Sequence, residues 1–315
     1  MTEYFLLNYA DEQGAARAGI KVGDKIVDIE KGLAATGKSA ALGGADARST
    51  MAILGAWDKA EPALEALAAA ASDQKLLGGA SKPLAGAKLM APLLYPSGIF
   101  CAAANFTDHM REMSGREPPD KTKTRPYFFP KTIAHSIIGP EDPIRLPKVS
   151  KQVDWEAEVG VVIGKPARNV SEADAMNYVA GYTIMNDLSL RDLGSRTDWN
   201  FRVDWFQHKC FDGSAPLGPW IAPAKSIKDP YKLAMKLWVN KELMQDSSTS
   251  FMHFDIAEQI SYLSERLTLR PGDIISTGTP SGVGRPRGIF LKPGDEVTIE
   301  VEGIGRLHNP VVQGE

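Results

Sequence analysis

The chain has 315 residues, of which 43% are hydrophobic and 24% charged, and its formal net charge is −3. These values are ordinary for a globular protein with a large core, and the length allows one large domain or two smaller ones. The nearly balanced charge gives no basic field, so nucleic acid is not an expected partner. The two cysteines, Cys101 and Cys210, are too few for a disulfide framework or a four-cysteine zinc site.

No segment of the sequence predicts an association with a membrane. The first residues, MTEYFLLNYADEQG, lack the basic and apolar regions of a signal peptide. No apolar run approaches the roughly 18 residues that a membrane span needs. We therefore expect a cytoplasmic protein whose cysteines stay reduced and which has no membrane partner.

Residues 1–90 are expected to form a small N-terminal α/β domain. The segments 4–10 and 18–30 alternate between apolar and polar residues around turn signals, which predicts a small β-meander. The alanine-rich segment 49–72 predicts a helix that Pro62 interrupts.

The Gly/Pro/Lys-rich segment 78–96 is expected to link this domain to a second one over residues 91–315. Beyond it the sequence predicts strands and tight turns, with one helix beginning at Ser171 and another over about 255–266. The expected strands are the apolar segments 158–163, 180–186, 233–239, 273–276 and 296–301. The polar segment 111–125 is long for a loop and is expected to be a lid.

Residues 32–39, GLAATGKS, match the pattern of a phosphate-binding P-loop. That chemistry needs a buried strand before the loop and a helix after it whose first turn faces the phosphates. Here the preceding segment 24–30 is amphipathic and charged, and Gly43 and Gly44 would end a following helix within a turn. A nucleotide-binding protein therefore stays a remote alternative.

Three carboxylates alternate in the stretch DWEAEVG at 154–160. Successive side chains of a strand point to opposite faces, so Asp154, Glu156 and Glu158 share one face. A half-exposed strand with a solvated acidic face is the simpler interpretation of the stretch alone. Like charges on one face repel, however, so a strand that collects them often holds a cation.

His109 and Glu112 lie three residues apart on an expected helical turn, so their side chains are neighbours. A carboxylate that fixes one imidazole nitrogen leaves the other free to act as a general base. A surface His–Glu pair is the alternative. Farther along, Asn186 and Asp187 end an apolar strand, where side chains emerge from a rigid scaffold, although the same pair also suits a turn.

In chain order these motifs resemble the fumarylacetoacetate hydrolase family over roughly residues 95–310. The matching motifs are Asn105 to Met113, Glu156-Ala157-Glu158, Asn186-Asp187 with Arg191-Asp192, Lys209, Thr277 to Pro280 with Gly282-Val283-Gly284, and Val301 to Gly305. The first of them is most similar to the acylpyruvase branch. The resemblance implies an α+β, β-rich protein in which a catalytic domain of mixed β-sandwich or β-roll type follows the small N-terminal domain.

The resemblance also implies a metal site and a homodimer. Its three metal ligands would be Glu156, Glu158 and Asp187, whereas Asp154 is not a ligand in the family pattern and is expected behind the ligands or on the surface. All-oxygen ligation suits a hard divalent ion, Mg²⁺ first, with Mn²⁺ or Ca²⁺ as the other candidates.

The reaction implied is hydrolysis of a carbon–carbon bond in a small-molecule 2,4-dioxo acid, of the acylpyruvate, fumarylpyruvate or diketo-deoxy sugar acid type. His109, oriented by Glu112, would activate water, and Lys209 would stabilise developing negative charge. The candidates for binding the substrate carboxylate are Lys131, Arg191 and Thr279.

Other reactions stay open on the same metal site: decarboxylation of oxaloacetate, and isomerisation or hydration of a 2-oxo-enoate. Family members commonly carry Gln three residues after the arginine that matches Arg191, whereas this chain has Gly194. The stretch 194–207 is also distinctive, so the sequence does not define the acyl group of the substrate. A non-catalytic sugar- or acid-binding module is the alternative outside the enzymes.

Overall fold

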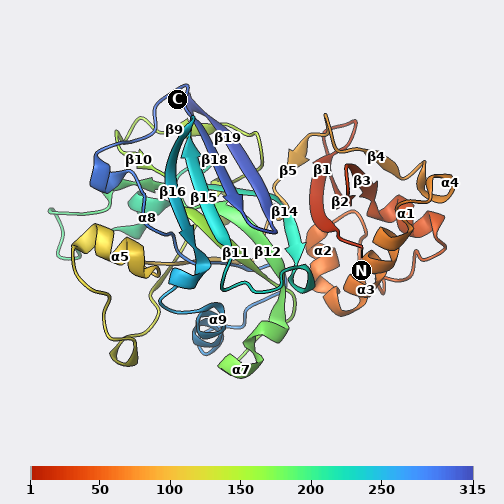
Figure 1. The fold of residues 1–315 in the computed structure, drawn as a ribbon, viewed down its shortest axis with the longest axis horizontal. Helices are drawn as coiled ribbons and strands as arrows, with labels where there is room; N and C mark the ends of the chain where they lie inside the picture. The colour runs from red at the N-terminus through yellow and green to blue at the C-terminus, as the bar shows by residue number, and fades with distance from the viewer. Residues whose placement is uncertain (1, 315) are drawn as a thin grey trace.

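Figure 1 shows the computed structural model, which describes residues 2–314. The described part contains a large mixed sheet, a five-stranded sheet and a two-stranded ribbon. In spatial order the large sheet consists of β4 (Ser81–Pro83), β3 (Lys25–Asp28), β2 (Ala16–Val22), β1 (Phe5–Ala10), β14 (Ala215–Pro223), β12 (Val179–Asn186), β11 (Ala157–Ile163), β17 (Ile274–Ser276), β6 (Ile99–Ala102) and β7 (Phe128–Pro130), with β5 (Leu89–Met90) beside β1 and β8 (Ile137–Ile138) beside β14.

The five-stranded sheet packs across the β11–β12 part of the large sheet, as Figure 1 shows. Its strands, in spatial order, are β16 (Glu242–Ser248), β15 (Ala234–Val239), β18 (Glu296–Val301), β19 (Gly305–Gln313) and β9 (Ile144–Leu146), and the ribbon joins β10 (Val153–Asp154) to β13 (Ser189–Leu190). One apolar cluster fills the space between the sheets and includes Trp155, Val161, Met235 and Ile299, all buried. The predicted α+β, β-rich fold with a sandwich-like core is therefore confirmed.

The helices are short and lie outside the sheets. They are α1 (Ile29–Ala35), α2 (Thr50–Gly55), α3 (Trp57–Ala70), α4 (Gln74–Leu77), α5 (Thr107–Ser114), α6 (Ile133–Ser136), α7 (Glu172–Ala175), α8 (Trp205–Lys209) and α9 (Ile256–Ser264). Helix α9 begins where predicted, because Asp255 and Glu258 form a reciprocal capping box at its first turn. No helix within residues 2–314 is long and apolar enough to cross a membrane.

The N-terminal region contributes strands to the large sheet. Strand β1 pairs with β14 through Leu6 and Ile221, and both residues belong to one buried apolar cluster. The segment 78–96, predicted to be a linker, contributes β4 and β5 to the same sheet because its backbone pairs with β3 and β1. The domain boundary near residue 90 stays a prediction.

One other N-terminal prediction needs correction. The interruption of the alanine-rich helix falls at Ala56, after Gly55, whereas Pro62 lies inside α3. Glycine lowers helix stability at that break, while α3 continues through Pro62 because its buried apolar face offsets the one hydrogen bond that the proline removes. Only the first half of the GLAATGKS segment belongs to α1, and residues 39–44 form turns. The helix that a phosphate-binding loop needs after it is therefore missing there, as expected.

The pairing of β12 with β14 requires a glycine at position 181. A Cβ added to Gly181 would lie 2.2 Å from the backbone oxygen of Ala222. We predict that Gly181→Ala lowers the free energy of unfolding by about 2–3 kcal/mol, the usual effect of overpacking. Urea unfolding measures this change.

The matched control is Gly55→Ala, because a Cβ there would meet no atom within 4 Å. Alanine has the higher helix propensity, so this control should leave stability unchanged or raise it by up to about 1 kcal/mol. Equal effects of the two substitutions would show that the close approach at Gly181 is not required.

Candidate active site

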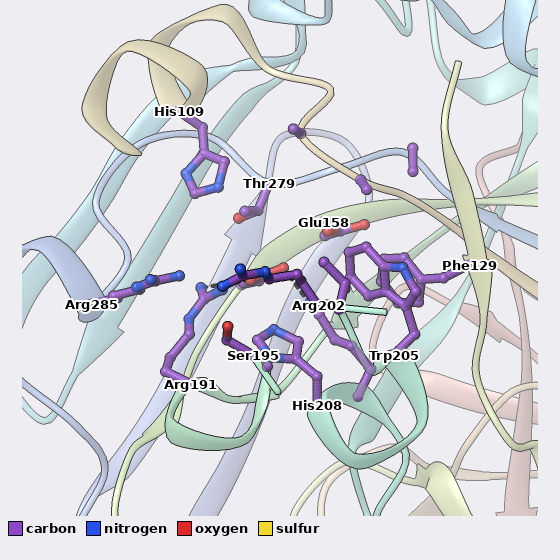
Figure 2. Close-up of a pocket in the computed structure, with 17 residues that line it drawn as sticks. His109, Phe129, Glu158, Arg191, Ser195, Arg202, Trp205, His208, Thr279 and Arg285 are labelled. Carbon is purple, nitrogen blue, oxygen red and sulfur yellow. Dashed lines mark hydrogen bonds and ion pairs between the residues drawn. The ribbon is translucent and has the colours of Figure 1, made fainter. Parts of the chain in front are cut away.

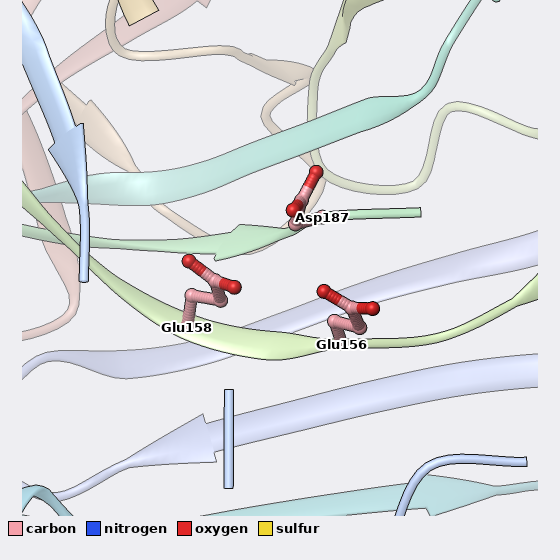
Figure 3. Close-up of side chains that lie close together, drawn as sticks. All are labelled: Glu156, Glu158 and Asp187. Atoms are coloured by element: carbon pink, nitrogen blue, oxygen red, sulfur yellow. The ribbon is translucent and has the colours of Figure 1, made fainter. Parts of the chain in front are cut away.

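Three carboxylates meet where β11 begins and β12 ends (Figure 3). In this antiparallel pair Ala157 lies opposite Asn186, so the next residue, Asp187, comes beside Glu156. One ligand oxygen from each of Glu156, Glu158 and Asp187 lies within 4.8 Å of the other two, and all three residues are buried. The three predicted ligands are therefore placed where one cation could contact all of them.

The strand that carries the glutamates is buried on both faces, since every residue from Val153 to Ile163 is buried. A solvated acidic face is therefore the wrong interpretation of this stretch. Asp154 does not join the other carboxylates, because the strand is interrupted between β10 and β11. Its oxygens instead accept hydrogen bonds from the N–H groups of Gly284 at 2.7 Å and Arg285 at 3.1 Å, and from Arg191 Nε at 2.7 Å.

Three buried cations hold two of the carboxylates in place. Lys209 Nζ donates to Glu156 Oε2 at 2.8 Å and to Asp187 Oδ2 at 2.6 Å. Lys131 Nζ lies 2.7 Å from Asp187 Oδ1, and Arg191 Nη2 lies 2.6 Å from Glu156 Oε1. Each of the two carboxylates therefore has two cationic partners, which compensate the cost of burying its charge.

These contacts keep Glu156 and Lys209 charged at neutral pH. Burial alone would raise the pKa of Glu156, but Lys209 and Arg191 outweigh it and hold that pKa well below its usual range. Burial alone would lower the pKa of Lys209, but Asp187 and Glu156 raise it above its usual range. Lys209 therefore stays an ammonium group.

Glu158 differs because it has no ion-pair partner among the described residues. Ser276 Oγ, at 2.6 Å, and the N–H of Gly278, at 2.9 Å, donate to its Oε2. Burial, and after it the neighbouring carboxylates of Asp187 and Glu156, raises the pKa of Glu158 well above its usual range. A protonated carboxyl beside two ionised ones suits a site that exchanges a proton for a metal ion.

The predicted His–Glu pair lies on α5, at the edge of the same site. His109 is buried, and its Nδ1 is 3.6 Å from Glu112 Oε2. The N–H of Gly282 donates to both carboxylate oxygens of Glu112 at 3.0 Å. The glycine-containing loop that follows β17 therefore fixes the carboxylate that faces the imidazole.

A cavity of about 360 Å³ brings most of the predicted residues together (Figure 2). That volume is within the usual range for small-molecule sites. Its lining includes His109, Glu156, Glu158, Arg191, Lys209 and Thr279. Its apolar wall contains Phe129 and Trp205, whose rings stack with centroids 4.3 Å apart.

The predicted substrate-binding residues differ in how free their polar groups are. Lys131 Nζ also donates to the backbone oxygens of Leu188 at 3.0 Å and Lys209 at 2.7 Å, so the protein engages it fully. The guanidinium of Arg191 already pairs with Asp154 and Glu156, as described above. Thr279 Oγ1 accepts from Gln245 Nε2 at 2.9 Å, which leaves its own proton available to the cavity.

The unusual glycine at position 194 is explained by His208. A Cβ on Gly194 would lie 2.1 Å from His208 Nδ1, so the imidazole occupies the space that a larger side chain would need. His208 is buried and lines the cavity. Burial, followed by the charges of Lys209 and Arg191, lowers the pKa of His208 to about 3, so the ring is neutral.

The cavity also contains residues that the sequence did not indicate as site residues: Arg202, Arg285, His208, Phe129 and Trp205. The distinctive stretch 194–207 was a signal for two of them, Arg202 and Trp205, and His208 directly follows it. Arg285 directly follows the Gly282-Val283-Gly284 motif, which was the available signal for that residue. Nothing in the sequence pattern marked Phe129.

A family model described as fumarylacetoacetate (FAA) hydrolase, C-terminal, matches residues 98–312, which is more than half of the chain. The chain belongs to the fumarylacetoacetate hydrolase family. The match contains every predicted site residue and begins after the predicted N-terminal domain. The family resemblance inferred from the motifs is confirmed.

Known relatives and solved structures cover much of this chain. The mitochondrial oxaloacetate tautomerase of Xenopus laevis is 42% identical over 229 residues, which span 71% of this chain and 68% of that protein. A mitochondrial oxaloacetate tautomerase of Rattus norvegicus is 41% identical over 234 residues, 73% of this chain and 71% of that one. The structure of maleylpyruvate hydrolase from Sphingobium, in complex with manganese(II) ion and pyruvate, is 31% identical with a TM-score of 0.74, over 99% of this chain and 100% of that one.

The protonated state of Glu158 predicts how metal affinity depends on pH. Because its pKa is raised in the metal-free protein, a bound divalent ion must displace a proton from this carboxyl. Mn²⁺ affinity should therefore increase with pH, by up to about tenfold per pH unit, until the pH passes that raised pKa.

Isothermal titration in buffers of different ionisation enthalpy measures both the affinity and the protons released. Glu158→Gln is the control, since it should abolish proton release whatever affinity remains. Affinity that does not change with pH in the wild type would contradict a protonated Glu158.

Proposed function

We propose that this protein is a metal-dependent hydrolase that cleaves a carbon–carbon bond in a 2,4-dioxo acid. The observation that carries the proposal is the placement of His109 in the same cavity as Glu156, Glu158 and Lys209. The similar maleylpyruvate hydrolase, whose structure holds manganese(II) and pyruvate, supports both a divalent metal and a 2-oxo acid as ligand.

Mg²⁺ is the ion we propose, with Mn²⁺ and Ca²⁺ as the other candidates, because hard cations prefer carboxylate oxygens. The chain fits such an ion, since the oxygens of Glu156, Glu158 and Asp187 lie within 4.8 Å of one another and are buried. When bound, the ion would polarise the 2-oxo group of the substrate and stabilise negative charge that develops on it.

His109 would act as the general base. Its Nδ1 is turned toward Glu112, so Nε2 is the nitrogen available to the cavity (Figure 2). In the proposed hydrolysis this nitrogen takes a proton from water, whose oxygen bonds to the distal acyl carbon. The carbon–carbon bond breaks, and the electron pair leaves as the enolate of pyruvate, which takes up a proton at its terminal carbon.

The other predicted residues would orient the substrate and balance its charge. Lys209 lines the cavity as an ammonium group, which supports its proposed role in stabilising an oxyanion. The hydroxyl of Thr279 can donate a hydrogen bond to the substrate. Lys131 and Arg191 would act mainly by holding Asp187 and Glu156 in place.

Oxaloacetate chemistry is the second candidate, because mitochondrial oxaloacetate tautomerases are about 40% identical to this chain. Tautomerisation moves a proton between carbon and oxygen, and decarboxylation releases carbon dioxide, so neither needs an attacking water. Release of pyruvate from an acylpyruvate, measured beside loss of the enol absorbance of oxaloacetate, distinguishes these reactions in one preparation.

Three further proposals concern the surroundings of the site. Of the predicted lid, residues 111–114 belong to α5. The remaining residues 115–125 are almost entirely exposed, which supports a lid that closes when ligand binds. The side chains of Trp199, Phe201 and Phe206 are exposed, and this cluster of apolar residues in one segment supports a homodimer. A cytoplasmic location also stays a proposal, and the names of the similar tautomerases place those proteins in mitochondria.

The role of His109 predicts a selective loss of hydrolysis. His109→Ala removes the base and leaves all three carboxylates in place, so acylpyruvate hydrolysis should fall by about 10²- to 10⁴-fold. Any decarboxylation of oxaloacetate should fall much less, because that reaction needs no activated water. Steady-state rates with saturating Mg²⁺ measure both.

The control is His135→Ala, since the His135 side chain is exposed and lies outside the cavity lining. This substitution should leave both rates close to those of the wild type. Full hydrolysis by His109→Ala would exclude His109 as the base.

A further inference from the structure

Two arginines at the cavity have no ion-pair partner within residues 2–314. Arg202 and Arg285 both line the cavity and are exposed. Figure 2 shows their side chains extending toward the middle of the cavity from opposite sides of the view. Arg191, which lines the same cavity, is by contrast committed to Asp154 and Glu156.

Arg202 is carried on a short hairpin. Ser195 and Val203 form an antiparallel bridge, and the N–H of Arg196 donates to the backbone oxygen of Arg202 at 2.8 Å. The side chain of Arg196 in turn pairs with Asp204 at 3.1 Å. The hairpin is therefore held by its own contacts, and Arg202 is the basic side chain that it contributes to the cavity lining.

Arg285 is fixed at its backbone by the site itself. Its N–H donates to Asp154 Oδ2 at 3.1 Å, and the neighbouring Gly284 N–H donates to Asp154 Oδ1 at 2.7 Å. The same Asp154 holds Arg191. The position of Arg285 is thus tied to the charged groups around the predicted metal ligands, while its guanidinium stays free.

The charge of the site indicates what these arginines can bind. Four buried carboxylates, those of Asp154, Glu156, Glu158 and Asp187, lie with three cations, those of Lys131, Lys209 and Arg191. With all four carboxylates ionised and a divalent ion bound, the formal charge of this group is +1, which one anionic group of the substrate neutralises. The two remaining guanidinium groups then match a second anion, and a planar carboxylate fits the fork of N–H donors that a guanidinium presents.

We propose that Arg202 and Arg285 form a second anion site that selects 2-oxo acids whose acyl group ends in a carboxylate. This inference rests on the proposed function for the metal end of the substrate. It assigns the acyl group, which the sequence does not define, to the dicarboxylate class. The stacked rings of Phe129 and Trp205 would line the path of the carbon chain between the two anionic ends.

The direct test compares fumarylpyruvate, which ends in a carboxylate, with acetylpyruvate, which ends in a methyl group. We expect the wild type to prefer fumarylpyruvate in kcat/KM. Arg202→Gln and Arg285→Gln should each lower the ratio of the two kcat/KM values about tenfold, and the double variant more, because each removes a charged hydrogen-bond donor. Arg145→Gln is the matched control, since Arg145 is exposed on β9 and outside the cavity lining.

A binding experiment separates this inference from the hydrolysis itself. N-oxalylglycine and oxamate share an oxalyl end, and only the first has a distal carboxylate. With Mn²⁺ present, the wild type should bind N-oxalylglycine at least about tenfold more tightly, and the two arginine variants should lose that preference. Titration calorimetry measures it without turnover.

Three outcomes test the hydrolase and the anion site separately. A preference for N-oxalylglycine that depends on Arg202 and Arg285, in a protein that hydrolyses neither diketo acid, would refute the hydrolase and support the anion site. Hydrolysis of both diketo acids with a ratio that the variants leave unchanged would refute the anion site and support the hydrolase. Failure to bind either analogue would overturn both.

Discussion

The site depends on a balance of buried charges at the start of β11. Moving a carboxylate into the interior costs several kcal/mol unless opposite charge or hydrogen bonds compensate it. Glu156 and Asp187 have that compensation from Lys131, Lys209 and Arg191, whereas Glu158 has hydrogen bonds and a raised pKa. The surrounding sheets keep these groups rigidly placed, because every residue from Val153 to Ile163 is buried. A bound divalent ion would supply the positive charge that the three carboxylates lack in the metal-free protein.

Much of the site could be predicted because it follows from local alternation and recognisable motifs. Strand parity placed Glu156 and Glu158 together, and the end of the next strand suggested Asp187. The parity argument failed for Asp154, because the interruption between β10 and β11 turns that carboxylate toward Gly284 and Arg285. Such an interruption depends on contacts distant in sequence.

The features that the sequence did not predict also depend on contacts between residues distant in sequence. Helix α3 continues through Pro62, and the expected linker adds strands to the sheet, because tertiary pairing outweighs local propensity. Likewise, no spacing in the sequence shows that His208 fills the space beside Gly194. The two arginines that distinguish this cavity, Arg202 and Arg285, are exposed, whereas the buried carboxylates follow the family pattern. We therefore attribute the class of reaction to the carboxylates and the choice of substrate to the two arginines.

The measurement that tests the central claim most directly is anomalous diffraction from crystals grown with Mn²⁺. The account predicts one strong peak per chain, within bonding distance of oxygens from Glu156, Glu158 and Asp187. Crystals of Asp187→Asn under the same conditions should lose most of that peak, because the amide lacks the charge that holds a hard cation. No peak among these three residues in the wild type, or an undiminished peak in Asp187→Asn, would contradict the account.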